Sequence, residues 1–282
     1  MRNVGDIQHA DEGTHRCCPS DENAARLAGA PRVSHGVCRF PRPAGLDALV
    51  EHYAGKERPA ASYDPQAWVE ALDGVLAESF VRRALERPDV TTRLAGPDRI
   101  AVDRAGLVAA VAGADFDDDE SLLAVWLLVQ AWGNSTRAQH GRQNIARAAA
   151  HRDQLLTNLR ATATILREAH EVASTEDAYR SWAGRIGIKE SFFTQWFAVA
   201  GIKPGRSWQP LTLDRSVWRT LNNTLGLTVH QIAGTTSQWV LYRTYVEMLH
   251  AWGGSGDGAQ RLEWVLFAHH GLPPVDPSSN VA

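Results

Sequence analysis

The sequence is poor in lysine: Lys56, Lys189 and Lys203 are its only three, among 29 basic residues in a chain of 282. There is no excess of positive charge either, because 32 acidic residues leave a net charge of −3. A protein that holds nucleic acid over its whole surface is usually basic. Any nucleic-acid interface must therefore depend on local features, and few amines are available for chemistry.

Cysteine is scarce as well. The chain has three, and all of them lie within the first 40 residues: Cys17, Cys18 and Cys38. With His15 and His35 they offer ligands for zinc, but their spacing matches no common zinc pattern and adjacent cysteines are awkward ligands. We favour reduced thiols in a flexible leader over residues 1–40, which lacks a periodic apolar pattern. No metal or organic cofactor is expected.

Long hydrophobic runs are also missing. No apolar stretch reaches the ~20 residues that a membrane helix needs, and the first residues contain no apolar segment of the kind found in a secretory signal. Apolar residues make up 44% of the chain, which is ordinary for a soluble globular protein. The sequence therefore predicts a cytoplasmic protein without a membrane partner. We also expect a monomer.

Helical spacing dominates what is present. From Leu46 onward the apolar residues recur with a helical period, and no convincing strand alternation is visible, so the predicted fold class is all-α. Asp64 followed by Pro65 is a helix start, and Asp103 is a cap for a further short helix. The length fits one large domain or two small lobes that share an interface. We expect a helical domain over residues 41–275 and a frayed tail over residues 276–282.

The clearest predicted helix is central and buried. Acidic residues at 117–120 crowd its N-terminus, where the helix dipole favours anions. The helix is apolar all round, and Gly133 ends it. Its large apolar residues are Leu122, Leu123, Val125, Trp126, Leu127, Leu128 and Val129. A polar helical stretch with almost unopposed positive charge follows, and its arginines are either a solvated face or contacts to phosphate. These arginines are Arg137, Arg142, Arg147, Arg152, Arg160 and Arg167.

The segment from Tyr179 to Leu225 carries the most information about function. It predicts a helix ending near residue 186, a turn at Gly187, a second helix entered near Phe192, and a proline-containing loop that leads to a third helix at Asp214. A tight glycine turn and a helix N-terminus can present backbone N–H groups to a phosphate. Lys189 lies beside this turn and adds a point charge. The remaining expected helices span residues 178–186, 192–200, 215–225, 236–252 and 257–270.

This segment resembles the hairpin-plus-aspartate region of the helix-hairpin-helix DNA glycosylase superfamily, which contains 8-oxoguanine DNA glycosylase. The likeness is greatest to bacterial proteins with that glycosylase's fold, some of which serve in phage defence. Thr194-Gln195 stands where the family has Thr-Lys, and Leu211-Thr212-Leu213-Asp214 stands where it has its aspartate segment. Trp132-Gly133, followed by Arg137 and Arg142, matches a Trp-Gly turn before an Arg-rich helix. The resemblance covers roughly residues 120–250 and implies that the helical domain is built as two lobes.

The resemblance implies a set of roles for residues of this chain. Asp214 and Gln195 are the implied catalytic positions. The implied DNA contacts are Gly187, Lys189, Thr194, Arg137, Arg142 and Arg215. The implied base pocket comprises Trp132, Gly133 and Asn134. The implied partner is double-stranded DNA that contains a modified, flipped-out base.

One departure from the family pattern is chemically decisive. A lysine at position 195 would attack the sugar C1′ as an amine and permit strand cleavage through a Schiff base. Gln195 cannot do so, because an amide nitrogen has no nucleophilic lone pair. Some superfamily members lack the lysine and hydrolyse the glycosidic bond with the aspartate alone. The sequence therefore predicts a glycosylase without lyase activity.

Each of these positions also has a plain structural interpretation. Asp214 fits a helix cap after a proline loop, a role that can coexist with catalysis. Gln195 is by default a solvated helix residue, and Trp132-Gly133 a helix stop. The aromatic residues Phe192, Phe193, Trp196 and Phe197 fit a core stripe better than a base-stacking platform.

Three functions remain open from the sequence alone. The leading hypothesis is a monofunctional DNA glycosylase that releases a modified base, with a defence role implied only by family likeness. The second, motivated by Gln195, is a DNA-binding protein that kept the hairpin and lost catalysis. The third, motivated by the net charge of −3, is a helical interaction protein. The identity of the target base is not encoded in any local motif.

Overall fold

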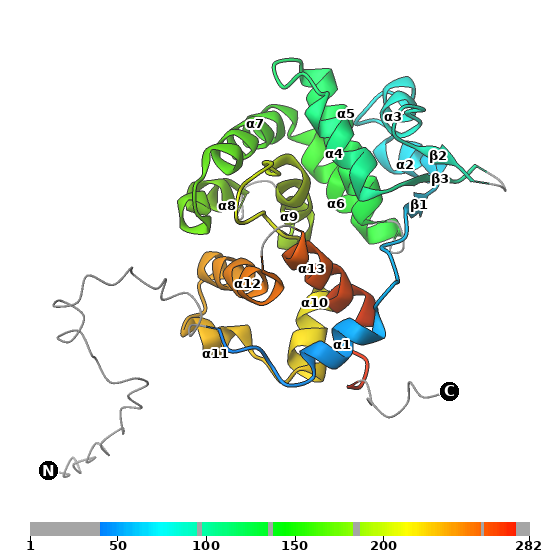
Figure 1. The fold of residues 1–282 in the computed structure, drawn as a ribbon. Helices are drawn as coiled ribbons and strands as arrows, with labels where there is room; N and C mark the ends of the chain where they lie inside the picture. The colour runs from blue at the N-terminus through cyan, green and yellow to red at the C-terminus, as the bar shows by residue number, and fades with distance from the viewer. Residues whose placement is uncertain (1–39, 95–97, 135–137, 183–186, 255–256, 275–282) are drawn as a thin grey trace, which may run out of the picture. The chain divides into compact units, whose positions relative to one another are not determined.

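Helices make up most of the chain in the computed structural model, which describes residues 40–94, 98–134, 138–182, 187–254 and 257–274 (Figure 1). The expected all-α class is confirmed. The described α-helices are α1 (Leu46–His52), α2 (Pro65–Leu72), α3 (Glu78–Leu85), α4 (Arg104–Ala112), α5 (Asp119–Gly133), α6 (Ala138–Ala150), α7 (Arg152–Glu168), α8 (Glu176–Trp182), α9 (Glu190–Ala200), α10 (Arg215–Arg219), α11 (Val229–Ala233), α12 (Gln238–Gly253) and α13 (Gly258–His269). A 3-10 helix η2 (Val172–Thr175) precedes α8, and a π-helical turn η3 (Thr220–Thr224) extends α10.

Local side-chain chemistry sets several helix starts. The Asp64 carboxylate accepts a hydrogen bond from the backbone N–H of Gln66, and Pro65 occupies the first turn of α2. Asp103 accepts in the same way from Gly106 at the start of α4. Such caps satisfy backbone donors that have no partner within the helix. Both predicted starts are confirmed.

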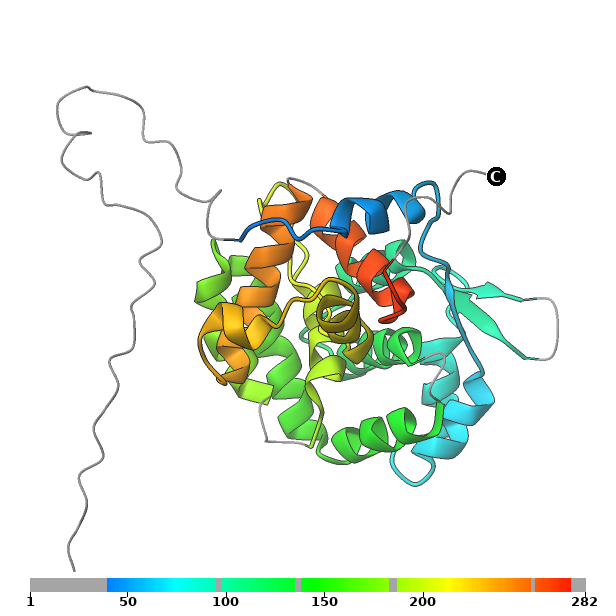
Figure 2. The same cartoon turned by 90° about the horizontal axis from the view of Figure 1, so that it is seen from below.

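The expectation of no strands is wrong at one place. Strands β1 (Ala61–Tyr63), β2 (Thr92–Arg93) and β3 (Ile100–Val102) form a small antiparallel sheet in the order β1-β3-β2. Tyr63 pairs with Ile100 in β3, which in turn pairs with Arg93. Strands of two or three residues are too short to show an alternating pattern. The sheet lies at one edge of the fold (Figure 2).

Helix α5 occupies the centre of the larger group of helices. Its residues from Leu122 to Trp132 are buried except Ala124, and it packs against α3, α4, α7 and α9. The Asp118 carboxylate caps it by accepting from the backbone N–H groups of Glu120 and Ser121. The prediction of a central buried helix is confirmed. The aromatic stripe at Phe192, Phe193, Trp196 and Phe197 on α9 is buried too, in agreement with the core interpretation.

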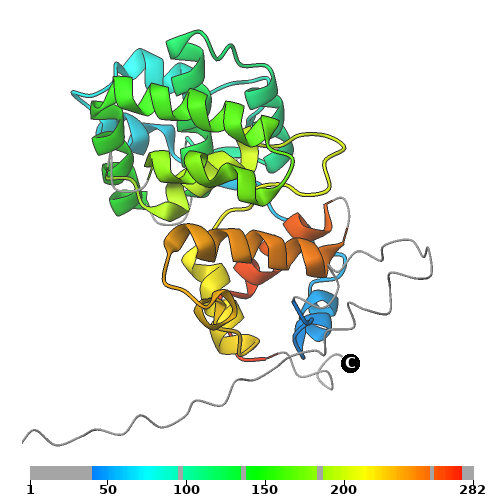
Figure 3. The same cartoon turned by 90° about the vertical axis from the view of Figure 1, so that its left-hand side faces the viewer.

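From Phe40 onward the chain forms one unit, within which two groups of helices are visible. Figure 3 shows α2 to α9 in one group and α1 with α10 to α13 in the other. The polypeptide crosses between them before β1 and again between α9 and α10. Residues from both groups consequently meet where these crossings pass, and this is where the pocket described below is found.

None of the helices that the structure describes has both the length and the apolar character that a bilayer crossing requires. Several predicted features lie outside the described residues: the leader before Phe40 with its cysteines and histidines, Arg137, and the tail over residues 276–282.

Candidate active site

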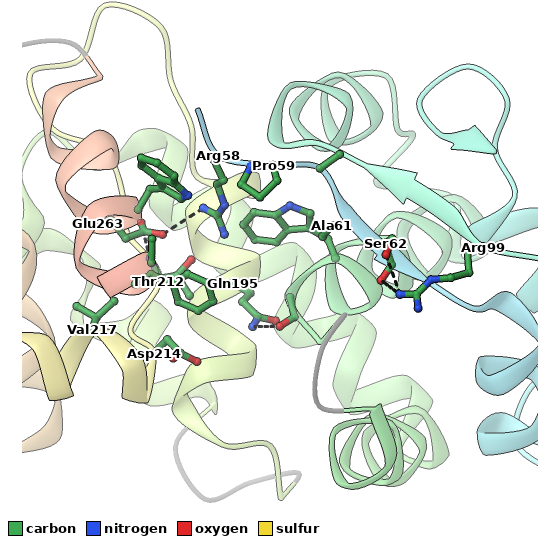
Figure 4. A pocket seen from close by; sticks show the side chains of 16 residues that line it. Arg58, Pro59, Ala61, Ser62, Arg99, Gln195, Thr212, Asp214, Val217 and Glu263 are labelled. Carbon is green, nitrogen blue, oxygen red and sulfur yellow. Dashed lines mark hydrogen bonds and ion pairs between the residues drawn. The ribbon is translucent and has the colours of Figure 1, made fainter. Parts of the chain in front are cut away.

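A pocket of about 380 Å³ opens where α5 and α9 face α10 and α13. Four residues predicted from the sequence line it: Trp132, Gly133, Gln195 and Asp214. Figure 4 shows the Gln195 and Asp214 side chains reaching the same space from α9 and from the start of α10. The other lining residues are Arg58, Pro59, Ala60, Ala61, Ser62, Arg99, Thr212, Val217, Glu263, Trp264, Phe267 and Ala268.

Asp214 is both a helix cap and a wall of the pocket. Its Oδ1 accepts a hydrogen bond of 2.6 Å from the backbone N–H of Ser216, which fixes the carboxylate at the start of α10. No hydrogen bond or ion pair to another described residue engages Oδ2. One oxygen therefore orients the group, and the other is available to a ligand in the pocket.

Two buried tyrosines hold the backbone just before Asp214. The Tyr242 hydroxyl donates to the carbonyl of Leu211 at 3.0 Å, and the Tyr245 hydroxyl donates to the carbonyl of Thr212, also at 3.0 Å. Burial raises the pKa of both phenols, so both remain protonated donors at neutral pH. The segment that carries Asp214 is thus fixed by helix α12.

Thr194 holds the same segment from the other side, which corrects its predicted role as a DNA contact. Its side chain is fully buried, and its hydroxyl donates to the carbonyl of Glu190 at 2.8 Å. The same oxygen accepts the backbone N–H of Leu213 at 3.0 Å. A hydroxyl engaged in this way inside the protein positions the aspartate segment and does not reach DNA.

Gln195 projects from α9 against the end of α5. Only 5% of its surface is exposed, and its Nε2 donates to the carbonyl of Gly133 at 3.4 Å. Its Oε1 is buried without a hydrogen-bond partner. The expectation of a solvated helix residue is therefore wrong, and a ligand that donates to Oε1 would relieve the cost of an unpaired buried acceptor.

Gly133 leaves room for this contact. A Cβ atom at position 133 would lie 2.1 Å from Cδ of Gln195, so any larger residue there would force the Gln195 amide to move. The neighbouring Asn134 points elsewhere: its Nδ2 donates to the carbonyl of Gln130 and so caps α5, and it does not line the pocket. The structure thus brings Trp132 and Gly133 to the pocket and leaves Asn134 at the helix end.

Arg58 is a pocket residue that the sequence did not reveal. Its guanidinium carbon lies 4.0 Å from the centroid of the Trp132 ring, and its Nη1 lies 3.6 Å from Oε1 of Glu263. Burial lowers the pKa of Arg58 to about 10, with Glu263 opposing that shift, so the group remains charged at neutral pH. Arg58 lies in an irregular segment with no motif around it, and no local signal could have identified it.

Glu263 is the buried carboxylate that joins these features. Only 2% of it is exposed, and its Oε2 accepts the backbone N–H of Thr212 at 3.0 Å. Nη1 of Arg104 lies 3.9 Å from the same oxygen. Burial of a charge is costly unless it is paired, and here two guanidinium groups and an amide supply the compensation. An acidic residue within the apolar run of α13 was the available sequence signal.

The other predicted DNA contacts differ in their exposure to solvent. Gly187 and Lys189 are exposed, Gly187 has φ of +68°, and Lys189 occupies the N-cap position of α9. Arg215 is exposed at the first residue of α10, immediately after Asp214. Arg142 is half-buried. Their placement leaves Gly187, Lys189 and Arg215 accessible to a phosphate backbone.

Two arginines of the basic stretch have structural partners. Nε of Arg160 donates to the carbonyl of Phe116 at 2.6 Å, and Nε of Arg167 donates to the carbonyl of Ala200 at 2.8 Å. These side chains secure loop and helix ends against α7. Both side chains remain half-buried at the surface of α7.

Within the described residues, no group of three or more His, Cys, Asp or Glu side chains is arranged to hold a metal ion. The pocket is instead lined by aromatic rings and by polar side chains that can bind an organic ligand. A carboxylate, an amide and a guanidinium surround a space whose walls include Trp132, Trp264 and Phe267. Such a pocket suits a flat, polar, aromatic ligand attached to a group that becomes positively charged near Asp214 when the bond between them breaks.

Comparison with known families gives one match. The model of the family described as "Putative 8-oxoguanine DNA glycosylase OGG-like protein" matches residues 56–267. That span contains Arg58, Trp132, Gln195, Asp214 and Glu263. No match was found among curated proteins or among solved structures.

Proposed function

The chain belongs to this OGG-like family of 8-oxoguanine DNA glycosylase proteins, and from that premise we propose that it hydrolyses the N-glycosidic bond of a modified base flipped out of duplex DNA. The observation that carries the proposal is the convergence of Asp214 and Gln195 on one aromatic-walled pocket. The products are a free base and an intact strand with an abasic site.

The proposed mechanism uses the charge of Asp214. Departure of the base leaves the deoxyribose with oxocarbenium character, as in other glycoside hydrolyses. A fixed carboxylate stabilises that positive charge and orients or deprotonates the attacking water. The hydrogen bond from Ser216 holds the carboxylate in place before the reaction begins. The hydrogen bonds of Thr194, Tyr242 and Tyr245 to the backbone of residues 211–213 hold the segment that carries it. Little reorganisation is then needed in the transition state.

The proposal excludes a lyase step because the pocket offers no amine. Gln195 occupies the position where the resembling glycosylases carry lysine, and none of the three lysines lines the pocket. Lys203 is exposed in the loop before α10, as expected from its Gly-Pro surroundings. Hydrolysis by water is the chemistry that these residues support.

An alternative function rests on the same residue. Gln195 also fits a DNA-binding protein that retains the pocket and has lost catalysis. Binding to modified duplex DNA in a gel-shift assay without formation of abasic sites would favour that alternative. We further propose that the modified bases occur in phage DNA, an inference that rests on the resemblance to bacterial proteins of which some serve in phage defence.

The first test is a screen of genomic DNAs that carry different natural base modifications. Each DNA is incubated with the protein, and abasic sites are detected by alkali-induced strand cleavage. We expect cleavage in at least one modified DNA and none in DNA with the four ordinary bases. The absence of abasic sites in every DNA tested would contradict the proposed function.

Exchange of Lys189 for Glu should weaken binding to all duplexes alike. The exposed lysine at the N-terminus of α9 is placed for a phosphate contact, and such contacts position a protein without reading bases. The slope of log affinity against log salt should fall by about 1. Fluorescence anisotropy over a salt series measures this slope, and Lys203→Glu is the matched control that should leave it unchanged. An effect limited to one sequence context would count against a phosphate contact.

Gly133→Ala should reduce base release by about 10- to 100-fold, because the new methyl group displaces the Gln195 amide from the pocket. A double-mutant cycle separates this cause from general damage. In a Gln195→Ala background the smaller side chain leaves room for the methyl group, so Gly133→Ala should add little. Independent, multiplicative losses would show that Gly133 does not act through Gln195.

A further inference from the structure

Arg58 is a charged group of the pocket to which the proposed mechanism assigns no task. Its side chain is 25% exposed and lines the pocket, with its guanidinium stacked 4.0 Å from the Trp132 ring centroid. Among the described residues its only polar partner is Glu263, at 3.6 Å. A guanidinium has five N–H donors in a planar fork, so most of them remain available to a ligand in the pocket.

The position of Arg58 complements that of Asp214. Figure 4 shows the guanidinium of Arg58 and the carboxylate of Asp214 entering the same space from different sides, with Gln195 nearby. Glu263 links the two walls, since it pairs with Arg58 through Oε1 and accepts the backbone N–H of Thr212 through Oε2. The cation is therefore fixed relative to the segment that carries Asp214.

The chemistry of glycosidic cleavage calls for a cation on the far side of the base. When the C1′–N bond breaks, its electron pair leaves with the base, and water supplies the oxygen that bonds to C1′. The base departs as an anion and takes up a proton released from that water. A carboxylate at the sugar stabilises only the positive half of this charge separation, and fixed donors stabilise the negative half.

We propose that Arg58 hydrogen-bonds to the departing base, stabilises its developing negative charge, and selects bases that present a carbonyl oxygen to it over bases that present an amino group. This inference rests on the proposed function and adds the leaving-group side to it. A guanidinium can donate to a carbonyl oxygen and an adjacent ring nitrogen together. An amino group of the base would instead point its own N–H donors at the N–H donors of the guanidinium. The Trp132 ring, on which the guanidinium stacks, orients it for such contacts.

The test is the dependence of rate on the acidity of the leaving base. Single-turnover base release is measured for duplexes that carry a series of keto-bearing bases differing in ring substituents and hence in N–H acidity. Arg58→Met should lose roughly 100-fold or more with the poorest leaving groups, as for loss of one donor to a developing anion. The loss should shrink to about tenfold or less with the best leaving groups, because these need least stabilisation. The slope of log rate against leaving-group pKa therefore becomes steeper.

Controls keep this outcome interpretable. Arg99→Met is the matched variant, since Arg99 also lines the pocket but donates to Ser62, and it should leave the slope unchanged. Arg58→Met leaves Glu263 with one fewer cation, so Arg58→Met/Glu263→Gln is measured alongside it to guard against loss of folding. Arg58→Lys keeps the charge without the planar fork and should give an intermediate slope.

The outcomes separate this inference from the function on which it rests. Base release by the wild-type protein with a steeper slope in the two Arg58→Met variants supports the role of Arg58. Base release with parallel slopes, even at a reduced rate, overturns it and assigns Arg58 a purely structural role. Absence of base release by the wild-type protein from every duplex would instead contradict the proposed glycosylase function.

Discussion

Asp214→Asn should lower the single-turnover rate of base release by at least ~100-fold, by comparison with other fixed electrostatic stabilisers. The substitution removes the negative charge that faces the sugar and keeps the shape of the side chain. Asn is as good a helix N-cap as Asp, so its Oδ1 can still accept the backbone N–H of Ser216. The thermal unfolding midpoint should therefore change little, which isolates the charge as the cause of the lost rate.

A second aspartate provides the matched control for this experiment. Asp118 caps α5 as Asp214 caps α10, but it is exposed and does not line the pocket. Asp118→Asn should leave the rate of base release unchanged. Equal rates for Asp214→Asn and the wild-type protein would remove Asp214 from the mechanism, and a large loss in Asp118→Asn would show that the assay reports folding.

The reaction product should be an intact strand, with no protein–DNA adduct trapped by borohydride. Trapping requires an imine between an amine and the opened sugar, and Gln195 cannot form one. End-labelled duplex shows strand cleavage directly, and a denaturing gel shows any adduct. Because lysines lowered in pKa by burial can attack a sugar carbon, Lys203→Ala is included to test the loop lysine.

A gain of function strengthens the same test. Gln195→Lys places an amine on the pocket wall beside Gly133, at the position where the resembling glycosylases carry lysine. We expect borohydride to trap this variant on DNA and not the wild-type protein. A wild-type adduct that disappears in Lys203→Ala would contradict hydrolysis by water alone and would make Lys203 the nucleophile.

Helix starts were predictable because their causes are local. Asp64 and Asp103 cap their helices through side-chain contacts within three residues, and Asp214 does the same. The buried α5 was predictable from its apolar residues on nearly every side. The three short strands were not, because β1 is held by pairing with β3 almost 40 residues later.

The pocket was predictable only in part. The resemblance pointed to Gln195 and Asp214, and the structure brings both to one pocket. It could not show that Glu263 sits between Arg58 and Arg104, because these contacts join residues about 160 to 205 positions apart in an irregular segment and two helices. Long-range contacts of this kind arise from the packing of the whole fold and leave no periodic trace in the sequence.

Thr194 shows how a resemblance can identify a residue and miss its task. Its place beside position 195 suggested contact with DNA, yet its hydroxyl connects α9 to the backbone of Leu213. Residues in a conspicuous motif serve either the ligand or the residues that touch the ligand. Burial distinguishes these roles, and burial is a property of the folded chain.

The central claim, that this pocket releases a base from DNA by hydrolysis, is tested most directly by mass spectrometry of the small molecules released from modified duplex DNA. The wild-type protein should release a free base in an amount equal to the number of abasic sites formed, and the strands should remain unbroken until alkali is added. Tight binding to the same duplex with no free base in solution would contradict the claim and favour a DNA-binding protein that has lost catalysis.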